Sequence, residues 1–275
     1  MNVEKDSTLI TQIIPADSQK KLTAAKSYYK KHLIKLNLRS SDYMKEFKGW
    51  ITDQNLKLDA IPAKFQEHVE ILKDVNEVYA AYFWPEHQAT CKKVLDDNID
   101  LIRQTEEKFA YGMMDLTRKP WQREKIKVKI TYYGTASNCN FEHRPYTTLT
   151  PTHVVMTAHG ANDIPGNWVE LLFHESAHHL IFSKYYFIGG TIEDITEIMG
   201  TEPRQFWHAY LFYLTGELTK QIFEEQNLTY ETTYMQRKVV FGRYYHLLDK
   251  YLKAYMQRNI TLEEATRKIL TELNP

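Results

Sequence analysis

The chain has 275 residues, and its 35 Lys and Arg residues balance 35 Asp and Glu residues, so the formal net charge is zero. This balance removes the usual electrostatic argument for nucleic acid or an anionic membrane as the partner, because both attract cationic surfaces. With 43% hydrophobic residues, the chain can bury a sizeable core in one large or two small domains. No stretch approaches the roughly 18 apolar residues of a membrane-spanning helix.

Signals for export and for disulfide bonding are sparse. The first 15 residues carry Glu4, Lys5 and Asp6 and no apolar block of signal-peptide length, so we expect a cytoplasmic protein unless a signal was removed before this numbering begins. Cys91 and Cys139 are too few for a disulfide scaffold and too far apart for a Cys-x-x-Cys metal site. Two unpaired thiols are the simpler interpretation, although one disulfide stays open. Nothing in the sequence indicates an oligomeric state.

The first hundred residues have the apolar spacing of helices. Between Ser18 and Thr117, apolar side chains recur every three or four positions in three runs, and Pro85 separates the second run from the third. No chemically reactive group stands out there. We therefore expect residues 1–119 to form a helical region that packs on the rest of the chain.

The hydrophobic period changes after Pro120. Between Ile126 and Tyr132, apolar residues alternate with Lys and Thr, which predicts a half-buried strand with its lysines in solvent. A second strand is expected at His153–Ala158. The pattern then predicts helices near residues 168–183, 192–199, 202–225, 237–258 and 262–273, the last beginning at Thr261. The expected fold is α+β and mainly helical, with a small mixed or antiparallel sheet and residues 120–275 as one compact region.

One motif in the first of these C-terminal helices suggests chemistry. His174, Glu175 and His178 form a His-Glu-x-x-His sequence. Residues i and i+4 lie on one helix face, so both imidazoles can bind a single Zn²⁺ at about 2.0–2.1 Å. Glu175 can then take a proton from a zinc-bound water and return it to a leaving amine. The alternative, two structural histidines and an ion-paired glutamate, requires a buried partner for each polar group.

The motif resembles the active-site helix of the zincin metallopeptidases. This resemblance covers about residues 125–220 and implies a helix packed beneath a mixed sheet, a mainly helical lower half and one catalytic zinc. It also implies an edge strand that pairs with the extended substrate, and His153–Ala158 lies where that strand is expected. The chain is unlike the metzincins, which need Gly at the position of Ile181 and His at the position of Lys184.

The third zinc ligand has more than one candidate. In the gluzincin pattern a Glu on the next helix is a ligand, and Glu197 has a familiar spacing, although Thr196 replaces the usual Asn. Glu193 offers the same face one turn earlier. His208 lies on an apolar stripe of the helix expected at 202–225, and we predict it as the third ligand, with Glu197 as the alternative. The motif combined with the later Trp-His…Leu-Phe-Tyr…Gly-Glu also resembles a little-characterised bacterial family of predicted zinc proteins.

Other polar residues near the motif have open roles. His179 lies about 100° round the helix from His178 and is not expected to be a ligand. Glu217 lies about 180° round its helix from His208, so we expect it either to orient His174 or His178 or to have a surface or helix-capping role. Zincins also stabilise the reaction's oxyanion with a Tyr, His or Arg. The C-terminal candidates for that role, among which the sequence does not choose, are Tyr234, Arg243, Tyr244, Tyr245 and His246.

The leading hypothesis is a zinc-dependent hydrolase, a metallopeptidase that acts on a peptide or protein with Glu175 as the general base. An alternative is a zincin-like binding or regulatory protein, in which a fourth side chain completes a non-catalytic metal site. A third interpretation, a helical partner-binding protein without metal, makes the motif a coincidence.

Overall fold

The structure is a computed structural model, and it describes residues 14–36, 41–53, 60–121, 125–133, 145–149, 152–160, 164–201 and 203–273. The chain divides into two compact units, and among the described residues the first unit ends at Cys91 and the second begins at Lys92. Helix α5, Trp84–Thr117, contributes to both. The sequence places the division at residue 119 instead, and packing of the N-terminal helices on the rest of the chain stays a prediction. Cys139 lies outside the described residues.

The first unit is built from helices and contains a small, mainly aromatic core. Phe47, Phe65 and Val69 are buried together, with partly buried residues such as Tyr43 and Trp50 packed against them. None of the residues of α2 is buried. As predicted, Pro85 separates two helices, since it stands in the first turn of α5, where its missing N–H costs no hydrogen bond. The other helices of this unit are α2 (Ala16–Tyr28, extended by a π turn at Tyr29–Leu33), α3 (Asp42–Asp53) and α4 (Gln66–Tyr82).

The second unit contains a small mixed sheet, as the sequence predicts, and its described residues form three strands, one more than the two that the sequence pattern indicates. Its strands are β1 (Lys127–Thr131), β2 (Tyr146–Leu149) and β3 (Thr152–Thr157), in the order β1-β3-β2. β1 is parallel to β3, and β2 is antiparallel to it. The expectation of an edge strand at His153–Ala158 is therefore wrong. β3 forms hydrogen bonds with a strand on each side, so it has no free edge for a substrate backbone.

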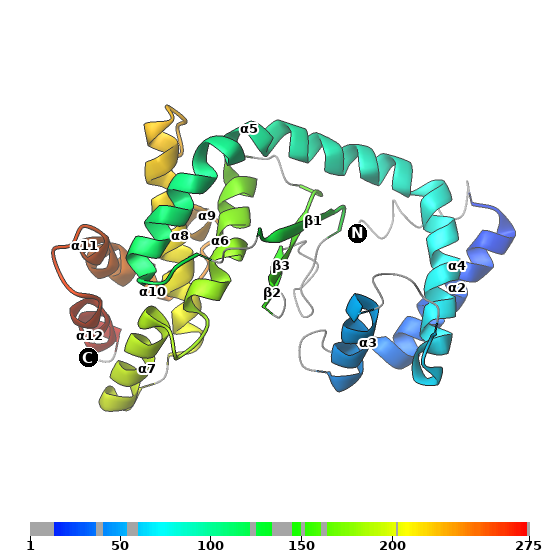
Figure 1. Cartoon of the computed structure of the whole chain (residues 1–275), viewed down its shortest axis with the longest axis horizontal. Helices are drawn as coiled ribbons and strands as arrows, with labels where there is room; N and C mark the ends of the chain where they lie inside the picture. The colour runs from blue at the N-terminus through cyan, green and yellow to red at the C-terminus, as the bar shows by residue number, and fades with distance from the viewer. Residues whose placement is uncertain are drawn as a thin grey trace. The chain divides into compact units, whose positions relative to one another are not determined.

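Helices make up the rest of the second unit. α6 is buried on nearly all sides, with 13 of its 15 residues buried, and α8 packs alongside it (Figure 1). The helix expected at 237–258 is interrupted, because Val239 and Phe241 adopt left-handed φ angles of 52° and 55°. The helices are α6 (Asn167–Ile181), α7 (Phe187–Met199), α8 (Phe206–Glu225), α9 (Tyr234–Arg237), α10 (Gly242–Leu247), α11 (Lys253–Met256, joined to α10 by the π turn Leu248–Leu252) and α12 (Leu262–Leu273).

Two glycines position α6 and α8. Gly166 precedes α6 with a φ of 80°, a left-handed conformation that favours glycine. Gly216 lies inside α8, where a Cβ would stand 3.0 Å from the Glu170 carboxylate of α6 and 3.0 Å from Thr233. Glycine therefore allows both neighbours to approach the backbone of α8, at a helix-propensity cost of about 1 kcal/mol.

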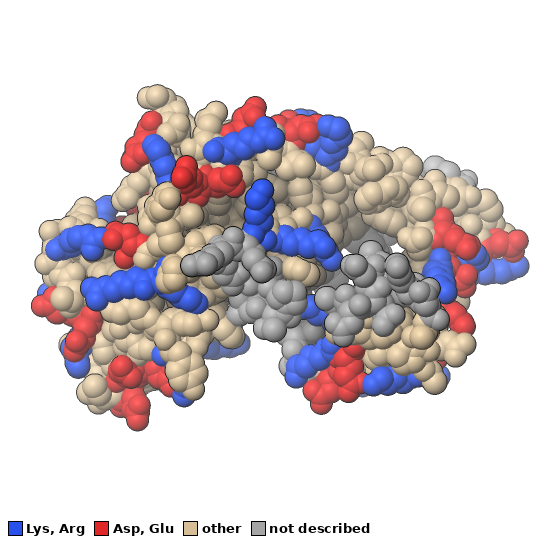
Figure 2. All heavy atoms as spheres, viewed as in Figure 1, with Lys and Arg blue, Asp and Glu red and all other residues tan. Residues whose placement is uncertain are grey.

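The surface charge is mixed, in agreement with the zero net charge. On the face that Figure 2 shows, basic and acidic side chains lie next to one another. Several form ion pairs, for example Lys108 with Glu225 at 2.8 Å and Lys250 with Glu272 at 2.8 Å. Exposed pairs of this kind stabilise a fold by about 0–1 kcal/mol each. Within the described segments, no helix has both the length and the apolar composition that a bilayer span requires.

Candidate metal centre

Helices α6 and α8 bring three histidines together. His174 and His178 share one face of α6, and His208 comes from the first turn of α8. Ring nitrogens of the three lie within 4.8 Å of one another, and no other described residues form such a group of three or more possible metal ligands. His174 is buried, and the other two are half-buried. His208, the third ligand that the sequence predicts, thus lies next to the motif. Its role as a metal ligand stays a prediction.

The nitrogen atoms fit a zinc ion in spacing and in chemistry. Two nitrogens that each lie about 2.0–2.1 Å from one tetrahedral zinc are roughly 3.3 Å apart, and Nε2 of His174 lies 3.2 Å from Nε2 of His208. Burial, and then the nearby imidazoles of His178 and His208, keep the pKa of His174 well below its ordinary value. The neutral ring that metals bind is therefore favoured. Three protein nitrogens also leave a fourth position open, as in catalytic zinc sites.

Thr215 fixes the tautomer of His174 from behind. Its hydroxyl donates to the backbone oxygen of Leu211 at 2.8 Å, and Nδ1 of His174 lies 3.3 Å from the same hydroxyl oxygen. Because the single hydroxyl hydrogen is used on the carbonyl, the oxygen accepts from Nδ1–H of His174. Nε2 then keeps its lone pair toward the other two histidines. The sequence offers only a weak signal for this role, a threonine within an apolar stripe of α8.

Aromatic rings enclose the three histidines. Phe212 stacks on His174, with 3.7 Å between ring centroids, and Trp207 stacks on His208 at 4.9 Å. Phe241 meets His208 edge-on at 5.4 Å. These contacts restrain the orientation of the imidazoles and lower the local dielectric, so electrostatic interactions within the site are stronger than in water.

Glu175 lies beside the histidines and is also buried. Its Oε2 atom is 3.5 Å from Nε2 of His178 and 2.7 Å from the hydroxyl of Thr147 on β2. The carboxylate therefore stands next to a ring nitrogen of one of the three grouped histidines. This is the placement that a general base for a metal-bound water requires.

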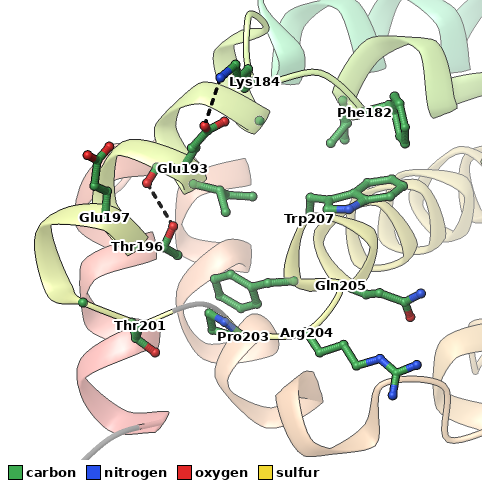
Figure 3. A pocket seen from close by; sticks show the side chains of 15 residues that line it. Phe182, Lys184, Glu193, Thr196, Glu197, Thr201, Pro203, Arg204, Gln205 and Trp207 are labelled. Carbon is green, nitrogen blue, oxygen red and sulfur yellow. Dashed lines mark hydrogen bonds and ion pairs between the residues drawn. The ribbon is translucent and has the colours of Figure 1, made fainter.

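The two glutamates that were alternative ligands lie away from the histidines. Glu193 and Glu197 are exposed on α7, where they line a pocket of about 1120 Å³ (Figure 3). Glu193 forms an ion pair with Lys184 at 3.5 Å. Trp207 and Phe182 stand on the opposite wall of this pocket (Figure 3). Trp207 lines the pocket and also stacks on His208, whereas neither glutamate joins the three-histidine group.

The remaining candidates have other environments. Nδ1 of His179 is 2.7 Å from the backbone oxygen of Ser176, outside the three-histidine group. Glu217 is buried rather than at the surface, and burial raises its pKa. Among the oxyanion candidates, Tyr234 packs on Phe212 with ring centroids 6.1 Å apart, one ring removed from His174. The others bond elsewhere or have no described contact with the three histidines: Arg243 donates to the hydroxyl of Tyr244, Tyr244 donates to the backbone of Arg204, Tyr245 accepts from Gln236, and His246 lies at the end of α10.

Comparison of the chain with protein-family models, with curated proteins and with solved structures finds no match. The site is therefore defined by its own geometry. It is a group of three histidines and a glutamate, presented by two packed helices of a mainly helical α+β protein.

Proposed function

We propose that the chain is a zinc-dependent hydrolase of the zincin type, with a peptide or protein as its substrate. The observation that carries this proposal is the convergence of His174, His178 and His208 beside the buried carboxylate of Glu175. The His-Glu-x-x-His helix also packs against a small mixed sheet, the arrangement that the zincin resemblance implies.

Each residue of the site has a distinct role in this proposal. A zinc ion held by the three histidines would polarise the scissile carbonyl and lower the pKa of a bound water. Glu175 accepts a proton from the attacking water and delivers it to the leaving amine. Thr215 holds His174 in the tautomer whose Nε2 has a free lone pair.

The pocket beside Trp207 supports a peptide as the substrate. Its walls combine the apolar rings of Phe182 and Trp207 with charged side chains such as Arg204 and Glu197. A peptide presents the same mixture of apolar side chains and polar backbone. Trp207 lines the pocket and stacks on His208. A peptide bound in the pocket would therefore lie next to the three histidines.

A second function, a metal site without catalysis, is favoured by one contact. Oε2 of Glu175 lies 3.5 Å from Nε2 of His178, so this carboxylate is within reach of serving as a fourth ligand. A zinc ion with four protein ligands is structural, because no position remains for water. In that case Glu175 holds the metal instead of activating water.

Substitution of Glu175 separates the two functions. The measurements are the zinc content of the purified full chain by atomic emission and its hydrolysis of fluorescein-labelled casein. For a hydrolase, Glu175→Gln retains one zinc and loses about 10²–10⁴-fold in rate, whereas the control Glu107→Gln, at an exposed glutamate of α5 away from the pocket, retains both properties. Loss of zinc from Glu175→Gln supports the structural site instead. A wild-type chain that takes up no stoichiometric zinc contradicts both functions.

A further inference from the structure

Strand β2 supplies a polar contact to the Glu175 carboxylate. The hydroxyl of Thr147 lies 2.7 Å from Oε2 of Glu175 and 2.7 Å from the backbone oxygen of the same residue. Both residues are buried. The single hydrogen of this buried hydroxyl can be donated to either of these two oxygens of Glu175, one at a time. The orientation of the Glu175 carboxylate is thereby restricted.

The register of the sheet determines which residue of β2 makes this contact. Thr147 pairs with Val154 of β3 in the antiparallel ladder, and Val154 is completely buried. Side chains alternate between the two faces of a strand, so a shift of one residue would turn Thr147 away from α6. Thr147 and Val154 are opposite each other and both are buried, so they share one buried face of the sheet in the observed register. The sheet therefore holds a hydroxyl against Glu175.

We propose that Thr147 is a positioning residue for Glu175, an inference that rests on the proposed hydrolase function. Its hydroxyl keeps Oε2 beside Nε2 of His178, at 3.5 Å, where the carboxylate can reach the attacking water. After Oε2 takes a proton from that water, the Thr147 hydrogen turns to the backbone oxygen, and the hydroxyl oxygen accepts from Oε2–H. The contact thus persists until the proton passes to the leaving amine. A methyl group in place of the hydroxyl can hydrogen-bond to neither the ionised nor the protonated carboxyl group of Glu175.

The test compares Thr147→Val and Thr147→Ser with a matched control, Thr157→Val. Thr157 is a buried threonine of β3 whose hydroxyl donates to the backbone of Tyr132 at 3.0 Å. One readout is the carboxylate ¹³C resonance of Glu175 in the metal-free full chain at a single pH, assigned by its absence in Glu175→Gln. The others are the zinc affinity and the casein hydrolysis of the zinc-loaded chain.

We expect Thr147→Val to shift the Glu175 resonance and to slow hydrolysis by up to about 100-fold at wild-type zinc affinity, because a small misplacement of a reacting group has an effect of that size. Thr147→Ser restores both readouts, and Thr157→Val changes neither. The proposal is overturned if Thr147→Val leaves the resonance and the rate unchanged, or if Thr157→Val matches its effect. If the wild-type chain binds zinc but cleaves nothing, the hydrolase function fails, and the resonance alone decides whether Thr147 orients Glu175.

Discussion

The two units of this protein use buried histidines in different ways. In the first unit, Nδ1 of His68 lies 3.1 Å from the hydroxyl of Tyr43, and the ring stacks on Phe47. His87 is similar, since its Nδ1 lies 2.9 Å from the hydroxyl of Tyr79. In the second unit, three half-buried or buried histidines turn ring nitrogens toward one another. Both units therefore bury histidines. In the first unit the partner of each ring is a tyrosine hydroxyl, and in the second it is another histidine.

That difference teaches how a metal site can be recognised among buried histidines. Burial lowers the pKa of both His68 and His174, so the neutral imidazole is favoured in each unit. A tyrosine hydroxyl can donate to the lone pair of a neutral ring and satisfy it. Several imidazole lone pairs that face one point need a shared cation or a hydrogen between them. His68 and His87 are therefore structural, whereas His174, His178 and His208 form the candidate metal centre.

The largest expected effect is the difference in zinc affinity between a variant without a metal-centre histidine and a variant without a structural histidine. His208→Ala should lower zinc affinity by more than the roughly 10–100-fold that loss of an outer hydrogen bond costs, because a ligand itself is lost. His68→Ala should destabilise the first unit and leave zinc affinity unchanged, as should Glu197→Gln. Competition with a chromophoric chelator measures all three. Equal zinc affinity in His208→Ala and the wild type would break the comparison.

A smaller loss of zinc affinity is expected behind His174. Thr215→Val removes the acceptor for Nδ1–H of His174, so the ring can place its hydrogen on Nε2 instead. Zinc affinity should fall about 10–100-fold. Thr215→Ser keeps the hydroxyl and should bind zinc as the wild type does. The same chelator competition measures both zinc affinities. Equal affinities of the valine and serine variants would show that Thr215 does not orient His174 for zinc binding.

Two buried glutamates of α6 extend the comparison to carboxylates. Glu170, one turn before His174, accepts from the hydroxyl of Tyr230 and from the backbone N–H of Tyr234 at 2.8 Å, and lies 3.7 Å from Arg237. Its partners tie the segment around α9 to α6. Glu170 is therefore structural, whereas Glu175 is the proposed general base.

The pH dependence of stability tests the role of Glu170. Burial raises the pKa of Glu170 from 4.5 to about 7, so the folded chain keeps a proton that the unfolded chain releases. This contribution to the free energy of unfolding is complete below pH 4.5 and is lost as the pH rises through about 7. Urea titrations should show that Glu170→Gln lacks this decline, of the order of 3 kcal/mol, and binds zinc normally. Parallel pH profiles for the variant and the wild type would contradict the assignment.

The smallest effect is expected in the first unit. Tyr43→Phe removes the hydrogen bond to His68 and should lower the free energy of unfolding by about 1 kcal/mol. Zinc affinity should not change. Chemical denaturation and the chelator competition measure the two quantities, and a change in zinc affinity would show that the structural histidines also affect the metal centre.

Local sequence patterns predicted part of the fold and of the site. The helix at residues 262–273 has its predicted bounds, and its start at Thr261 is confirmed by reciprocal hydrogen bonds with Glu264. The His-Glu-x-x-His spacing likewise identified one face of α6. These features depend on residues within a few positions of one another, where periodicity and capping rules apply.

Contacts between distant segments were beyond those patterns. Thr147 and Thr215 reach Glu175 and His174 across 28 and 41 residues, and no local period encodes such a contact. The central position of β3 was missed for the same reason, because alternation identifies a strand but not its neighbours. His208 and Glu197 both had acceptable spacings, and only the packing of α8 on α6 shows which one lies beside the motif.

The most direct test of the central claim is an anomalous difference map at the zinc absorption edge, from crystals of the full chain grown with zinc. We predict a single strong peak bonded to His174, His178 and His208, with the Glu175 carboxylate nearby but not bonded to it. A peak ligated by Glu197, or the absence of a peak among these histidines, would contradict the account.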